Sequence, residues 1–162
     1  MPGSEQDARH AFMRAAIEMS RGAVGDDLGG PFGAIVAKDG EIVGRGRNRV
    51  LGDRDPTAHA EVVAVREAAA RLGTHELKGC DVYASTEPCP MCMGALYWAR
   101  VERVFYATTR SDAAAIGFDD ARLYDELALD PGSREMSMAQ LLREEARAVL
   151  DAWADRPDRR LY

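Results

Sequence analysis

The chain has 162 residues, of which 46% are hydrophobic and 30% charged, so it can bury one sizeable core and has little room for a second full domain. Its formal net charge is −6, with 27 acidic against 21 basic residues, and its only lysines are Lys38 and Lys78. Nucleic acids are bound largely through clustered cationic side chains. This charge balance therefore disfavours a nucleic acid as partner.

The N-terminal segment carries acids and arginines where a secretory signal needs an unbroken apolar run, and three cysteines are too few for a disulfide framework. No stretch approaches the roughly 20 apolar residues needed to cross a bilayer. We therefore expect a soluble protein of the cytoplasm.

The first half of the chain predicts a helix, a hairpin and a second helix. Apolar residues recur at three-to-four spacing within residues 7–23, which indicates an amphipathic helix. Two strand-like runs in residues 33–50 flank Asp39-Gly40, a strong hairpin-turn signal. Residues 55–73 again have a helical apolar stripe, and Gly73 marks its end.

The second half continues the alternation of strands and helices. Residues 80–86 and 101–109 are short buried-strand candidates on either side of a helix that Pro90 opens. A helix-rich stretch follows from Ser111, with its last element at about residues 137–154. The pattern predicts a single α/β domain over residues 1–162, built as a three-layer α/β/α sandwich with a mixed central sheet.

Two of the three cysteines, Cys89 and Cys92, lie in a Pro-Cys-Pro-Met-Cys turn where a strand passes into a helix. Pro90 suits the first helical position, so Cys89 becomes the N-cap and Cys92 ends the first turn. Unpaired N–H groups at a helix start lower thiol pKa values and favour thiolates. That spacing suits a redox disulfide, a metal clip or simple packing, and the pair alone does not decide between them.

His59 and Glu61 decide in favour of a metal. They are two residues apart, so on a regular helix they would face nearly opposite ways and can converge only just beyond the helix start. Two helix starts aimed at one point would offer His59, Cys89 and Cys92 as ligands and Glu61 as a neighbouring acid. Three N/S ligands with one open position are typical of catalytic zinc.

Each feature also has a structural interpretation. A CxxC pair can be structural or redox-active, His59 can contact backbone, and Glu61 can simply complement the helix dipole. In combination, His-Ala-Glu with 27 residues between Glu61 and Cys89 comes close to the H-x-E…P-C-x-x-C pattern of zinc nucleobase deaminases. We interpret the third cysteine, Cys80, as a small buried core residue.

At these residues the chain resembles the cytidine deaminase superfamily, and more narrowly its bacterial guanine deaminases. The resemblance is carried by PFGAIVAKDG, GRN, DPTAHAEV, STEPCPMCMGALYWARVERVFYA, DAAAIGFDD and the C-terminal Tyr162. It implies one Zn²⁺ per subunit on His59, Cys89 and Cys92, with Glu61 as the catalytic proton carrier. It also implies a substrate pocket formed by Phe32 and Trp98 as walls, Asn48 on the base edge and the backbone around Ala60.

The resemblance further implies that Asp120 faces the purine or assists proton transfer and that Tyr162 closes the site. A homodimer is expected, with the C-terminal segment at about 137–162 crossing to the partner. The expected reaction converts guanine to xanthine and ammonia. Guanosine, cytosine, adenine or an aminotriazine such as ammeline are alternative substrates, and tRNA adenosine deamination, a non-enzymatic zinc module and a redox protein are rival functions.

Overall fold

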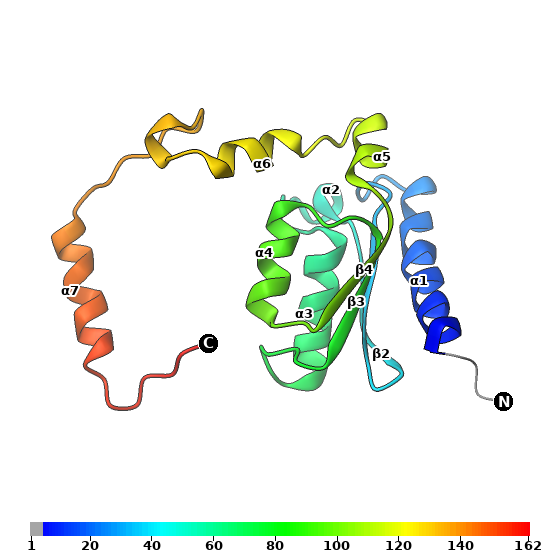
Figure 1. Ribbon diagram of the computed structural model, residues 1–162, viewed down its shortest axis with the longest axis horizontal. Coiled ribbons are helices and arrows are strands. Elements are labelled where there is room, and N and C mark those ends of the chain that lie inside the picture. The colour runs from blue at the N-terminus through cyan, green and yellow to red at the C-terminus, as the bar shows by residue number, and fades with distance from the viewer. Residues whose placement is uncertain (1–4) are drawn as a thin grey trace. The chain divides into compact units, whose positions relative to one another are not determined.

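The computed structural model describes residues 5–162 and divides the chain into two compact units, one ending at Asp120 and the other comprising Ala121–Tyr162. The first unit contains the sheet and most of the predicted site residues (Figure 1). The second consists of helices and connecting segments.

A four-stranded mixed sheet, in the order β2-β1-β3-β4, forms the centre of the first unit. β1 pairs antiparallel with both β2 and β3, whereas β3 and β4 run parallel. The strands expected at residues 80–86 and 101–109 are confirmed as β3 and β4. The bounds of the four are β1 Gly33–Lys38, β2 Glu41–Arg47, β3 Cys80–Thr86 and β4 Arg103–Thr108.

The predicted hairpin connects β1 to β2. Asp39 and Gly40, which form its turn, have φ angles of 50° and 82°. A two-residue turn with both angles positive matches the right-handed twist of the flanking strands. The Asp-Gly pair therefore sets the register next to the turn, and a one-residue shift between Val36 and Ala37 then brings Gly33 opposite Arg47 at the far end of the hairpin.

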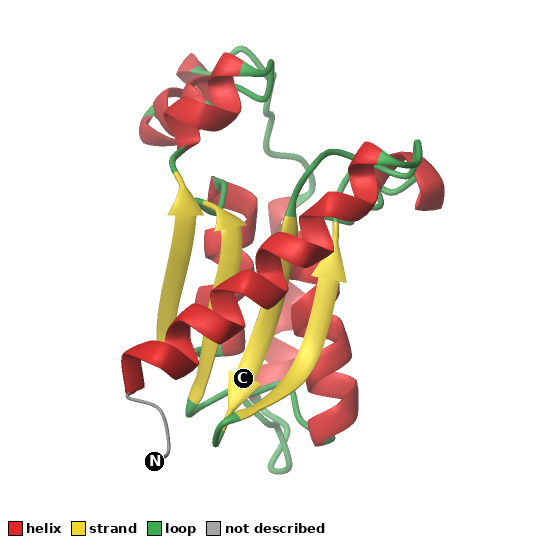
Figure 2. Cartoon of the chain, turned by 90° about the vertical axis from the view of Figure 1, so that its right-hand side faces the viewer, coloured by secondary structure: helices red, strands yellow, loops and turns green. Residues whose placement is uncertain are grey.

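Helices cover both faces of the sheet and confirm the predicted three layers. α1, Glu5–Arg21, crosses one face (Figure 2), where Ala16, Ile35 and Tyr83 are buried together. α3, Ala60–Leu72, and α4, Pro90–Ala99, cover the other face (Figure 1). The larger apolar core lies between these two helices and the strands.

The α3 helix lies unusually close to β2, and a glycine makes this possible. A Cβ atom placed on Gly46 would fall 2.1 Å from the carbonyl oxygen of Ala60, the first residue of α3. Any larger residue at this position would push the helix start away from the sheet. Gly46 thus helps to fix the position of His59, which directly precedes the helix.

The predicted second helix begins later than the sequence pattern suggested. Residues 55–59 form a turn, and α3 extends from Ala60 to Leu72 with Gly73 ending it in the left-handed conformation at φ 67°. The side chain of Asp55 accepts hydrogen bonds from the backbone N–H and hydroxyl of Thr57. This local bonding competes with helix formation and delays the helix start.

Short helices complete the first unit and lead into the second. The last predicted element, about 137–154, starts six residues later than expected, as α7 at Arg143. None of the helices in residues 5–162 is long and apolar enough to span a membrane. The remaining helical segments are η1 Gly22–Val24, α2 Val50–Asp53, α5 Arg110–Ala115, α6 Ala121–Ala128, η2 Pro131–Ser133 and α7 Arg143–Ala154.

Candidate zinc centre

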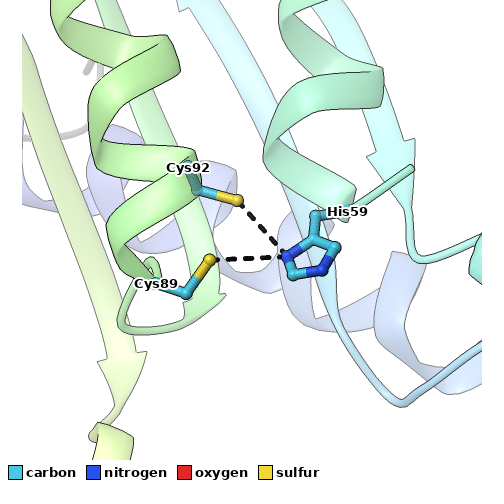
Figure 3. A group of neighbouring side chains, drawn as sticks. All are labelled: His59, Cys89 and Cys92. Carbon is cyan, nitrogen blue, oxygen red and sulfur yellow. Dashed lines mark hydrogen bonds between the residues drawn. The ribbon is translucent and has the colours of Figure 1, made fainter. Parts of the chain in front are cut away.

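Two helix starts bring the three predicted ligands together (Figure 3). His59 is the N-cap of α3, and Cys89 is the N-cap of α4 with Pro90 at its first position. The Sγ atoms of Cys89 and Cys92 each lie 3.5 Å from Nδ1 of His59. One donor atom from each residue lies within 4.8 Å of the others, so a single ion can reach all three.

The local chain explains why His59 faces this point. It has an extended conformation, with φ −70° and ψ 153°, and therefore does not follow the helical direction of Glu61. On its N-terminal side, the carbonyl of Ala58 accepts a hydrogen bond from the backbone N–H of Arg49 at 2.9 Å. On its C-terminal side, the His59 carbonyl accepts the first bond of the helix, from Val63 at 3.0 Å.

The two thiols differ in their tendency to ionise. Hydrogen bonding from Cys92, together with the contact to His59, lowers the pKa of Cys89 to about 4 despite partial burial. Sharing that bond with Cys89 raises the pKa of Cys92, and burial raises it further. The metal-free site therefore holds one thiolate at neutral pH, on Cys89, and binding an ion requires Cys92 to release its proton.

Glu61 lies in the first turn of α3 beside the cysteines. Its side chain is only 7% exposed, and its Oε2 is 3.3 Å from Sγ of Cys92. Burial raises the pKa of Glu61, because a carboxylate loses hydration there. Burial and a raised pKa are the properties that suit a carboxyl group to move protons near neutral pH.

This donor set fits zinc. One imidazole nitrogen and two thiolates are borderline-to-soft ligands of the kind Zn²⁺ prefers, and three protein ligands leave a coordination position for water or substrate. The buried Glu61 carboxyl group lies beside the set, hydrogen-bonded to one of its cysteines. A structural zinc site would normally be closed by a fourth protein ligand instead.

Asn48 and Phe32 lie on the segments that flank β1 and β2. The backbone N–H of Asn48 bonds to the Phe32 carbonyl at 3.0 Å, and the Asn48 side chain is 7% exposed. The loop ahead of β1 is pressed against Asn48: a Cβ atom on Gly29 would fall 2.2 Å from its Oδ1. The assignment of Asn48 to the base edge and Phe32 to the pocket wall remains a prediction.

The structure adds Phe118, which sequence reasoning missed. Its ring meets that of Phe32 edge-to-face with centroids 5.0 Å apart. Phe118 is 48% exposed and so presents much of its surface to solvent. Phe118 lies within the segment DAAAIGFDD, directly before Asp119 and Asp120, and this position is the sequence signal that could have identified it.

The other predicted residues are distributed over both units. Asp120 is partly buried, and burial is the main cause that raises its pKa, with the Cys89 thiolate adding to the effect and Arg110 opposing it. Ala60 is fully buried as the first residue of α3. Trp98 lies about two and a half helical turns beyond Cys89, in a surface pocket of about 310 Å³ shared with Tyr97 and Arg100.

The structure therefore does not bring Trp98 to the zinc ligands of its own chain. Tyr162 belongs to the second unit, where its side chain is 73% exposed. The predicted roles of Trp98, Ala60, Asp120 and Tyr162 in substrate binding or catalysis remain predictions.

Comparison with protein-family models matches residues 6–108 to the cytidine and deoxycytidylate deaminase zinc-binding region. The chain belongs to this deaminase family. It is therefore a zinc-dependent hydrolytic deaminase, as predicted, and the His-Cys-Cys set is a group of residues that can hold its zinc. The rival interpretations as a redox protein and as a non-enzymatic zinc module are discarded on the same finding.

Individual relatives extend the comparison beyond the zinc motif. The chain is 42% identical over 151 residues to the guanine deaminase of Bacillus subtilis, covering 93% of this chain and 97% of the relative. A crystal structure of guanine deaminase from that organism matches with a TM-score of 0.91, covering 94% of this chain and 98% of the other. The tRNA-specific adenosine deaminase of Aquifex aeolicus is 41% identical over 105 residues, covering 65% of this chain and 66% of the relative.

Proposed function

We propose that this protein is a guanine deaminase that hydrolyses guanine to xanthine and ammonia. The observation that carries the proposal is the extent of the similarity to the Bacillus subtilis guanine deaminase, which covers 97% of that relative. The zinc motif alone is common to the whole family. The match to the guanine deaminase combines 93% coverage of this chain with 42% identity. The tRNA-specific adenosine deaminases match either a shorter part of this chain, 65% for that of Aquifex aeolicus, or at lower identity, 33% over 84% of this chain for that of Agrobacterium fabrum.

The residues of the site support a hydrolytic step. A zinc ion held by His59, Cys89 and Cys92 would supply an activated water molecule at neutral pH. Glu61 would take one proton from water as the water oxygen bonds to C2 of guanine, and would pass this proton to ring nitrogen N3. Glu61 would then take the remaining proton from the new hydroxyl group at C2 and deliver it to the departing amine. The bond between C2 and the exocyclic amine nitrogen breaks, ammonia leaves, and a carbonyl remains at C2.

Substrate binding is assigned to residues around this centre. Asn48 contacts the edge of the base, Phe32 packs against its ring, and the backbone at Ala60 adds polar contacts. Asp120 faces the amino and ring N–H groups of the purine, and its raised pKa suits a second proton carrier. Trp98 is left out of this assignment, because its position on α4 is away from the zinc ligands of its own chain.

We further propose a cytoplasmic homodimer in which the single domain exchanges its C-terminal segment, about 137–162, with a partner. The second unit supports this proposal because large apolar side chains in it are exposed, and in a monomer they would face water. In this arrangement Tyr162 closes the site and excludes water from it. These exposed residues include Leu141, Leu142, Val149, Leu150, Trp153 and Leu161.

Small purines rather than RNA are the proposed substrates. The similarity to tRNA-specific adenosine deaminases makes RNA editing the second candidate, but the net charge of −6 disfavours binding to a phosphate backbone. An ammonia-release screen over guanine, guanosine, adenine, cytosine, cytidine and ammeline tests the proposal. Guanine is expected to be the best substrate, and turnover of cytidine without guanine, or inosine formed in tRNA, would refute it.

A further inference from the structure

Two adjacent residues at the end of β2 hold the loop that precedes β1, and we call residues 26–30 of that loop the entrance loop. Arg47 donates from Nη2 to Oδ2 of Asp26 at 2.6 Å. Asn48, the next residue, accepts at Oδ1 from the backbone N–H of Gly30 at 3.3 Å. The entrance loop is therefore fastened at both of its ends.

The contacts to Asn48 fix the direction of its amide. Its Oδ1 accepts from the backbone N–H of Gly30 at 3.3 Å and from that of Val50 at 3.2 Å. An amide nitrogen in this position would face two donors, so the assignment of oxygen and nitrogen follows from the surrounding backbone. The NH₂ group is left to donate, which suits a carbonyl or ring nitrogen of a base.

Further hydrogen bonds connect the two fastening points through the loop. The second oxygen of Asp26, Oδ1, accepts from the backbone N–H of Leu28 at 3.1 Å. The Leu28 carbonyl accepts from the backbone N–H groups of Leu51 and Gly52 at 3.0 and 2.9 Å. Arg47, the entrance loop, the start of α2 and Asn48 thus form one closed set of contacts.

We propose that Asp26 and Arg47 are positioning residues that hold the Asn48 amide ready for the base. The proposal rests on the proposed function for the identity of the base and for the assignment of Asn48 to the edge of that base. The ion pair is half-buried, with 35% and 21% of the two side chains exposed, and is therefore less open to solvent than a pair on the free surface. The hydrogen bond from Arg47 lowers the pKa of Asp26 and keeps it charged at neutral pH.

The expected result of breaking the pair is weaker binding of substrate with the chemical step preserved. In Asp26→Asn the entrance loop loses its charged partner, so Asn48 has to be ordered when the base binds. Ordering one side chain on binding corresponds to a rise in KM of roughly 2- to 10-fold. The kcat value and the zinc content stay near those of the wild type, because the hydrogen bonds of Asp26 and Arg47 join these two residues to each other and to Leu28, not to a metal ligand.

The matched control is Asp81→Asn, which breaks the ion pair between Asp81 on β3 and Arg103 on β4. This substitution is expected to leave KM unchanged. Arg47→Met raises KM as Asp26→Asn does, and the double variant does no more than either single change, since the two act as a unit. Asp26→Glu, which keeps the charge, recovers much of the loss. An unchanged KM, additive single effects, or a loss of kcat or zinc in place of a KM change overturns the proposal.

Hydrogen exchange separates this proposal from the proposed function, because it needs no substrate. The backbone amides of Gly30 and Val50 exchange faster in zinc-loaded Asp26→Asn than in the wild type or Asp81→Asn. Equal exchange in all three proteins rejects the positioning role. A wild-type protein that releases no ammonia from guanine rejects the proposed function instead, and the KM comparison is then made with the ring that it does deaminate.

Discussion

Replacing Glu61 with glutamine tests whether Glu61 carries protons in the reaction without being a metal ligand. The substitution keeps the size and shape of the side chain and removes its ability to carry a proton. Glu61 is buried and contacts Sγ of Cys92 at 3.3 Å, but it is outside the ligand set. A glutamine amide can keep a hydrogen bond to that sulfur, so we expect zinc and fold to be retained.

The expected loss of activity follows from the role of the carboxyl group. A positioned general acid or base contributes roughly 10²- to 10⁴-fold to the rate, which corresponds to about 2.7–5.4 kcal/mol at about 1.36 kcal/mol per tenfold. The same substitution changes how stability depends on pH. Burial raises the pKa of Glu61 above its ordinary 4.5, so the zinc-free wild type loses stability as the pH rises from 4.5 through the raised pKa. The glutamine variant has no such group and does not show this loss.

The assay is ammonia release from guanine by proteins with matched zinc content. Glu67→Gln provides the control on the same helix, because Glu67 is exposed and its Oε2 accepts only from the Arg45 backbone at 3.1 Å, a bond that glutamine can keep. The control is expected to have wild-type activity. Near-normal turnover by zinc-loaded Glu61→Gln would refute the assigned role, as would a loss of the metal.

Three further results are expected. Cys92→Ser is expected to lose zinc and to lower Tm by roughly 10 °C. A bound ligand at about 1,000 times its Kd adds about 4 kcal/mol to the free energy of unfolding, and the Tm of a protein of this size shifts by about 2–4 °C per kcal/mol. Metal analysis and thermal unfolding measure the two effects, and full zinc content in the variant contradicts the prediction. In zinc-free protein, iodoacetamide is expected to modify Cys89 at a rate that is nearly constant from about pH 6 to 8, because the pKa of Cys89 is about 4. The fully buried Cys80 is expected to react little. Peptide mass spectrometry measures both rates, and a modification rate of Cys89 that rises steeply with pH argues against the thiolate. Removing Leu161 and Tyr162 lowers guanine turnover by about tenfold or more without loss of zinc, because water enters the site, and unchanged kinetics would show that the terminus has no part in catalysis.

The sequence predicted those parts of the structure that depend on local signals. Asp39-Gly40 defines its turn, Pro90 opens its helix, and Gly73 ends one, because turn and cap residues act through their own backbone preferences. The zinc ligands could be predicted for a different reason. Metal chemistry restricts which residue types can converge, so His59 and the cysteine pair stood out even though 29 residues lie between His59 and Cys89.

Tertiary contacts without such a signal could not be predicted. The edge-to-face pair of Phe118 with Phe32 and the ion pair of Asp26 with Arg47 join residues far apart in the chain, and many other aromatic or charged residues would match the same pattern. The delayed start of α3 arises from competition between the Asp55 side chain and helix formation, which the apolar stripe does not register. Trp98 was assigned to the pocket by resemblance, although its nine-residue separation from Cys89 on the predicted helix already indicated a position away from the ligands.

Deamination of guanine in H₂¹⁸O tests the central claim most directly. Zinc-loaded protein is incubated with guanine, and the products are analysed by mass spectrometry together with an ammonia assay. The account predicts one ammonia for each xanthine formed, with a single ¹⁸O in xanthine, because the oxygen at C2 comes from water and the oxygen at C6 is unchanged. Xanthine without the label, or no xanthine from a zinc-loaded protein that releases ammonia from another ring, would contradict it.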